Sequence, residues 1–99
     1  MNFNDFINSL QKNEPPLDIE NTLEAIWYAK KHNWHKAHQI AQNISTTIGS
    51  WIHAYLHRVE GDQFNAEYWY RKANMRPIND SLNKEANQII KQILDLNNL

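Results

Sequence analysis

Two histidines and a glutamate stand at helical spacing in the segment WIHAYLHRVEGDQFNAEYWYRKA, residues 51–73. His53, His57 and Glu60 are four and three residues apart, so a helix places all three on one stripe. Two imidazoles one turn apart, together with a carboxylate, can ligate zinc or another divalent ion. They can also form a general base with its orienting partner. A metal-dependent or acid/base enzyme is therefore one hypothesis for this protein.

The same stripe also fits a purely structural role, and the sequence favours that interpretation. No HExxH or comparable signature accompanies the histidines. At a contact between two helices, the imidazoles would hydrogen-bond buried partners such as Tyr68, Tyr70 or backbone carbonyls. A second group, His32, His35 and His38, has no carboxylate near it in sequence, which favours solvated or partly packed side chains. We therefore predict no catalytic residue and no cofactor.

Aromatic and arginine side chains of the same segment predict a binding surface, because these residue types dominate binding hot spots. The predicted contact residues are Tyr55, Arg58, Tyr68 and Arg71. The arginines can pair with acids around the Gly61 turn, or act as forks for a carboxylate or phosphate on a partner. Trp51 and Trp69 are predicted to lie in the core instead.

Composition limits the classes of function. The chain has 99 residues, a formal net charge of -1 and no cysteine. The charge argues against binding to nucleic acid or to an anionic membrane, and the lack of cysteine excludes disulfides and thiolate chemistry. The first residues, MNFNDFINSL, do not resemble a signal peptide, and no apolar stretch approaches the roughly 20 residues of a membrane span. We expect a soluble cytoplasmic protein.

The hydrophobic pattern predicts an all-α chain of six helices in one domain. Only two glycines and three prolines occur, and apolar residues recur at helical rather than alternating spacing. The predicted parts are an N-terminal helix with linker (1–17), a helical hairpin (18–44), a second hairpin (45–77) and a capping helix (78–99).

Residues at the ends of these segments predict where individual helices begin and end. Asp18 or Asn21 is the expected N-cap of the second helix, and residues 45–47 supply caps for the fourth. Gly61 is placed to end the fourth helix in a left-handed conformation. Asp62 is then the expected N-cap of the fifth helix.

The two hairpins have an internal similarity. Residues 32–44 align with residues 61–73 at a shift of 29 positions, which suggests stacked α-hairpins. The stretch EGDQFNAEYWYRKANMRP resembles the end of a tetratricopeptide repeat, with Gly-Asp at the turn followed by Ala66, Tyr70, Ala73 and Pro77.

This resemblance covers about residues 20–77 and departs from the repeat in two ways. His53 and His57 occupy places that usually hold leucine or an aromatic residue, and the usual period of 34 is shortened to 29. The segment 51–73 is also similar to a motif of short bacterial proteins without an assigned activity. The repeat resemblance implies a concave surface that binds a protein or peptide.

The leading hypothesis is thus a small intracellular protein–protein interaction module whose concave side carries the predicted contact residues. Two hairpins are fewer than the three or so repeats that a solenoid needs, so the flanking helices must cover the apolar ends. If the flanking helices cover only one end, the apolar surface at the other end would drive self-association, and we would expect a homodimer.

Overall fold

The computed structural model describes residues 1–97, which contain six helices and no strand. The helices are α1 (Phe3–Ser9), α2 (Asn21–Lys30), α3 (Trp34–Ala41), α4 (Thr47–Val59), α5 (Gln63–Lys72) and α6 (Leu82–Asn97). The prediction of an all-α chain is confirmed. The last two positions of the predicted capping helix, Asn98 and Leu99, lie outside the described residues.

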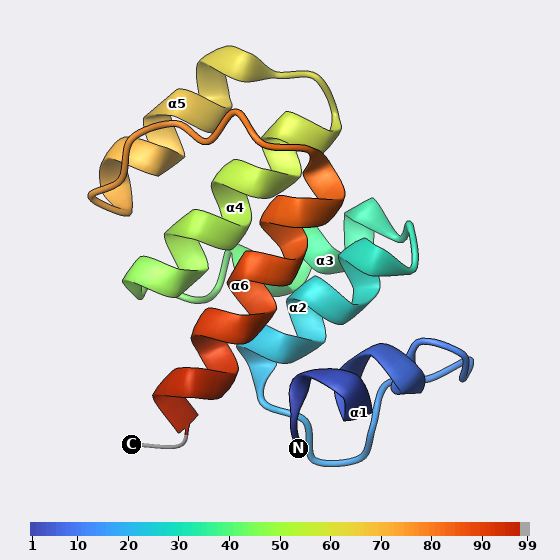
Figure 1. Ribbon diagram of the computed structural model, residues 1–99. Coiled ribbons are helices and arrows are strands. Elements are labelled where there is room, and N and C mark those ends of the chain that lie inside the picture. Colours follow the sequence, from blue (N-terminus) through green and yellow to red (C-terminus); the bar gives the residue numbers. More distant parts are fainter. Residues whose placement is uncertain (98–99) are drawn as a thin grey trace.

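The helices form two layers (Figure 1). In one layer α2 packs on α3 and α4 packs on α5, with α3 also against α4. The C-terminal helix α6 makes the second layer and runs across both α2 and α4, while α1 contacts α6. The predicted helix pairs are in contact, and their stacking as tetratricopeptide repeats stays a prediction. The last helix covers the side of α2 and α4 rather than one end of the stack.

Local capping explains several of the helix boundaries. The side chain of Thr46 accepts the backbone N–H of Gly49 at 3.1 Å, and Asp62 accepts that of Asn65 at 3.1 Å. Gly61 has φ +82°, the left-handed conformation expected after α4. These three expectations are confirmed.

Neither residue expected to cap α2 is its N-cap, although the helix does begin at Asn21. Glu20 is the N-cap and makes no side-chain capping bond, because Asn21 is already helical and Asp18 sits in a turn with φ +60°. Val59 and Leu96 belong to the apolar stripes of α4 and α6 but are exposed, by 41% and 48%. Both lie in the last turn of their helix.

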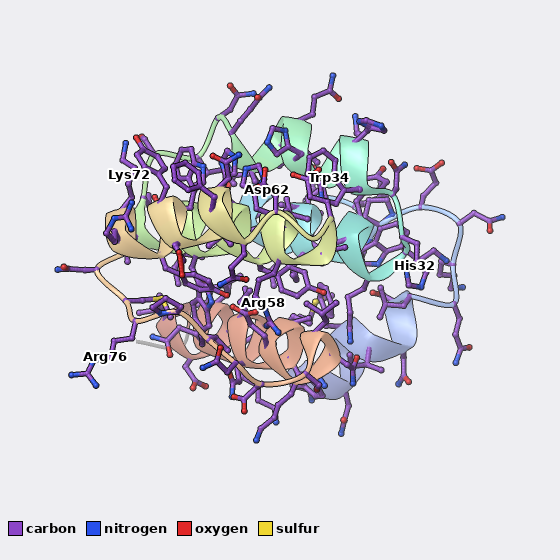
Figure 2. The ribbon with its side chains drawn as sticks, turned by 90° about the horizontal axis from the view of Figure 1, so that it is seen from above. His32, Trp34, Arg58, Asp62, Lys72 and Arg76 are labelled. Atoms are coloured by element: carbon purple, nitrogen blue, oxygen red, sulfur yellow. The ribbon has the colours of Figure 1, made fainter. Side chains whose placement is uncertain are left out.

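The central helix α4 has two faces that contact different helices. Trp51, Tyr55 and Arg58 lie on the face toward α6, where the first two are buried. His53 and His57 lie on the opposite face, toward α3 and α5. Figure 2 shows Arg58 between α4 and α6, with Trp34 of α3 on the other side of α4. The stripe of histidines is therefore separated from the second layer.

A buried carboxylate joins the two layers. Glu85 of α6 is completely inaccessible to solvent. One of its oxygens accepts hydrogen bonds from the Tyr70 hydroxyl and, at 3.0 Å, from Trp51 Nε1. The other accepts from Arg58 Nη1 at 2.5 Å, and Arg58 Nη2 donates to the carbonyl of Asp80. Burial and the bond to Glu85 raise the pKa of Tyr70, so the hydroxyl stays a donor. The sequence pattern did not reveal Glu85, which looks like an ordinary exposed helix acid.

We predict that Glu85→Ala destabilises the protein by about 3 kcal/mol, because it leaves Arg58 without its partner and opens a cavity. Urea denaturation at neutral pH measures this change. Asp95→Ala is the control, since Asp95 is an exposed acid on the same helix, and it should change stability by less than about 0.5 kcal/mol. Equal effects of the two substitutions would contradict a linking role for Glu85.

Candidate functional site

Three histidines from two helices converge on one point. His38 comes from α3, and His53 and His57 come from α4. One ring nitrogen of each lies within 4.8 Å of those of the other two, and Nε2 of His38 is 3.0 Å from Nε2 of His53. The sequence identified His53 and His57 as a stripe but placed His38 in a different group. The signal in the sequence that could have found His38 is Trp34 four residues earlier, because a helix places these two rings on the same face.

Two tryptophans hold these imidazoles in place. The His53 ring is stacked on Trp69 of α5, with centroids 3.8 Å apart and an angle of 9° between planes. His38 is stacked on Trp34 in the same way, at 4.7 Å and 11°. The Trp34 ring is itself fixed, because its Nε1 donates to the carbonyl of Leu56 at 2.7 Å. Each ring is thus oriented before any ligand arrives.

The predicted hydrogen-bond partners of the histidines were wrong. Neither His53 nor His57 bonds to Tyr68 or Tyr70 among the described residues: Tyr70 bonds Glu85, and Tyr68 is 44% exposed. The contact of His53 with α5 is an aromatic stack instead. The reason is geometric, since Trp69 rather than a tyrosine projects from α5 over the His53 ring.

Glu60 fixes the tautomer of His57. Its Oε2 lies 2.7 Å from Nδ1 of His57, three residues earlier. A carboxylate only accepts hydrogen bonds, so Nδ1 carries a proton and Nε2 is the nitrogen available to a metal. A carboxylate behind a histidine is the usual second partner of metal-binding imidazoles. In this structure Glu60 orients His57, while the sequence proposed it as a third ligand.

The environment disfavours protonation of His53 and His38. Burial, and then the neighbouring rings of His38 and His57, lower the pKa of His53 to about 4. Burial and His57 also lower the pKa of His38, with Glu60 acting in the opposite direction. His53 is only 6% exposed. Neutral imidazoles are the form that binds metal.

The spacing of the nitrogens fits a metal ion. Two nitrogens bound to one zinc ion at about 2.0–2.1 Å lie roughly 3.3 Å apart in tetrahedral geometry. The separation of His38 and His53 Nε2 is 3.0 Å, and the widest in the group is within 4.8 Å, so small rotations bring all three to one ion. His57, Glu60 and Asp62 form a second group of this size. Asp62, however, already accepts two hydrogen bonds from Asn65.

The four residues predicted as binding contacts do not form one surface. Tyr55 is 6% exposed and Arg58 is engaged by Glu85, so the expectation that these two are exposed contacts is wrong. The cause is α6, which packs on α2 and α4. It covers a side of these helices where the repeat resemblance led us to expect a binding surface. Tyr68 and Arg71 are exposed on α5, and the sequence missed their neighbour Phe64, which is 81% exposed.

Comparisons with protein-family models, with curated proteins and with solved structures gave no match. No helix within residues 1–97 is long and apolar enough to cross a membrane. The chain is therefore described by its class alone, a small all-α protein with a histidine cluster between two helix pairs.

Acidification should destabilise this protein through His53. Its folded pKa of about 4 lies below the unfolded value of 6.5, so the unfolded state binds more protons between these values. This contribution to stability is complete above about pH 6.5 and is lost as the pH falls toward 4, by about 3 kcal/mol. Urea midpoints at several pH values measure this loss. His53→Phe keeps the stack on Trp69 and should make stability depend less on pH. If stability depends on pH as before, protonation of His53 is not the cause of the loss.

Proposed function

We propose that this protein binds a divalent transition-metal ion through His38, His53 and His57. The observation that carries the proposal is the convergence of three ring nitrogens within 4.8 Å, each from a ring fixed by a neighbour. A cluster that only packed the helices together would not need three ring nitrogens turned toward one another. Here Nε2 of His38 faces Nε2 of His53 at 3.0 Å, so a metal ion would replace the proton that they share.

The number of ligands indicates the type of site. Three protein ligands leave a fourth position for water or a substrate, which is the pattern of catalytic rather than structural zinc. Imidazole ligands suit zinc, copper and nickel. Because no thiolate is among them, these ligands are less soft than the cysteines of a zinc finger. The metal would lower the pKa of a bound water and supply a nucleophile or a Lewis acid.

The site is within reach of solvent. The His57 side chain is 12% exposed and that of Glu60 is 38% exposed, so the cluster lies at the edge of the core. His38 is half-buried and His53 is buried. Metal can therefore enter past His57 and Glu60, while the inner ligands stay shielded from protonation.

Zinc titration of the protein at pH 7.5 tests this proposal. Isothermal calorimetry or competition with a chromophoric chelator monitors the binding. We expect one ion per chain and, for His38→Ala and His57→Ala, at least about tenfold weaker binding. Glu60→Gln should weaken binding by roughly tenfold as well, because it removes the acceptor that fixes His57. All variants are first checked by circular dichroism.

His35→Ala is the matched control, since His35 lies on the same helix as His38 but is exposed and outside the cluster. Its affinity for zinc should equal that of the unmodified protein. Equal losses for His35→Ala and His38→Ala, or no stoichiometric binding at all, would refute the metal site.

Interaction with another protein is the second candidate function, and one surface of α5 supports it. Phe64, Tyr68 and Arg71 follow one another at helical spacing and are all exposed, Phe64 by 81%. Exposed aromatics beside an arginine are typical of binding hot spots. Among the described residues α5 makes its packing contacts with α4, which leaves this stripe uncovered. The partner surface is thus moved from the predicted concave groove to the outer face of α5.

Sedimentation velocity at several concentrations tests a second copy of the chain as the partner. If the α5 stripe is the contact, the protein dimerises and Phe64→Ala with Tyr68→Ala weakens the dimer by at least about tenfold. Leu17→Ala is the control, because Leu17 is 96% exposed and remote in sequence. A monomer at all concentrations would exclude self-association through α5.

A further inference from the structure

A polar cavity opens at the start of α4. Its volume is about 380 Å³, and its lining includes Ser45, Thr47, Ser50, His53, Trp69 and Lys72. This size matches the lower range of small-molecule sites. The lining contains hydroxyl groups and a lysine but no aspartate or glutamate. The cavity therefore favours a ligand that is negatively charged.

The backbone adds to the positive character of the cavity. Thr46 uses its side chain to satisfy the N–H of Gly49, and the N–H of Ser50 bonds the Thr46 carbonyl. The N–H groups of Thr47 and Ile48 have no hydrogen-bond partner within residues 1–97. Free N–H groups at the start of a 13-residue helix, aligned with its dipole, attract anions.

Ser50 supplies an independent sign of a ligand. Only 9% of the residue is exposed, and it lines the cavity. No described residue hydrogen-bonds its hydroxyl, and yet the hydroxyl is not among buried atoms left unsatisfied. The oxygen is therefore accessible from the cavity. A buried residue that keeps a free hydroxyl toward a hollow is positioned to bond something that enters it.

Lys72 supplies the charge. Its Nζ lies 5.3 Å from the Trp69 ring and 5.8 Å from the Tyr68 ring, and no carboxylate within 4.0 Å neutralises it among the described residues. Figure 2 shows Lys72 at the end of α5, on the side of the molecule away from α6. The ammonium group is thus held by aromatic rings and remains free to pair with an anion.

Gly49 gives the entrance its shape. A Cβ at this position would stand 2.2 Å from the carbonyl oxygen of Ile44, so only glycine lets the loop approach α4 this closely. The close approach sets residues 44–46 against the first turn of the helix. The hydroxyls of the loop and of α4 consequently face the same cavity.

We propose that this cavity binds the phosphate group of a small phosphate monoester. Three kinds of donor meet there: the free N–H group of Thr47 at the start of α4, the Ser50 hydroxyl, and the Lys72 ammonium. The volume exceeds that of phosphate alone and leaves room for a small organic part beside Trp69. The site does not require metal, although His53 lines this cavity and also belongs to the histidine cluster.

Amide-resolved NMR titration of the full chain tests the proposal, with EDTA present so that metal is excluded. The probes are inorganic phosphate and glycerol 3-phosphate. We expect saturable shifts of the Thr47, Ile48 and Ser50 amide signals, with a dissociation constant of about 1 mM or below for glycerol 3-phosphate. Lys72→Ala should weaken binding at least about fivefold, and Ser50→Ala about threefold.

Lys84→Ala is the matched control, because Lys84 is 65% exposed at the start of α6. Binding that weakens equally with Lys72→Ala and Lys84→Ala, or shifts that do not saturate, would overturn the site. Saturable binding of phosphate that is unchanged in Lys72→Ala would overturn it too. Because EDTA is present throughout, failure of the metal proposal leaves this result unaffected.

Discussion

The structure depends on the burial of one carboxylate. An ionised group without solvent is tolerated only when donors surround it, and Glu85 receives them from α4 and α5. This requirement fixes where α6 can lie, since only one position brings Glu85 to Arg58, Trp51 and Tyr70 together. Apolar contacts of Ile89, Ile90 and Ile93 add stability but tolerate sliding. The polar group therefore determines the register of the second layer.

The position of α6 decides which surfaces remain for function. Stacked helical hairpins, which residues 20–77 resemble, present a concave surface that can bind a peptide. Here the chain places its own helix on α2 and α4, so that Tyr55 and Arg58 serve internal contacts. The side of α4 that α6 does not cover faces α3 and α5, and it carries His53 and His57. Both proposed ligand sites are on this side.

Much of the fold could be predicted from the sequence, because helical periodicity and capping are local properties. The six helices, the Asp62 cap and the left-handed Gly61 belong to this class. His53, His57 and Glu60 could also be grouped, since they share a helix. His38 and Glu85 could not, because their partners come from other helices and neither residue type marks burial by itself. The predicted exposure of Tyr55 failed for the same reason, since it required knowing where α6 lies.

The histidine cluster shows how stability and ligand binding oppose each other. Burial on Trp69 lowers the pKa of His53 to about 4, which costs stability when the protein is acidified but keeps a lone pair available at neutral pH. Metal and protons therefore compete for the same nitrogens, so metal should bind most tightly and stabilise the fold most at neutral pH, where the imidazoles are not protonated. Since His53 also lines the phosphate cavity, an ion bound on one side of the ring adds positive charge beside the other. Coupling between two binding sites is thermodynamically reciprocal. Bound metal would therefore strengthen phosphate binding, and bound phosphate would strengthen metal binding by the same factor.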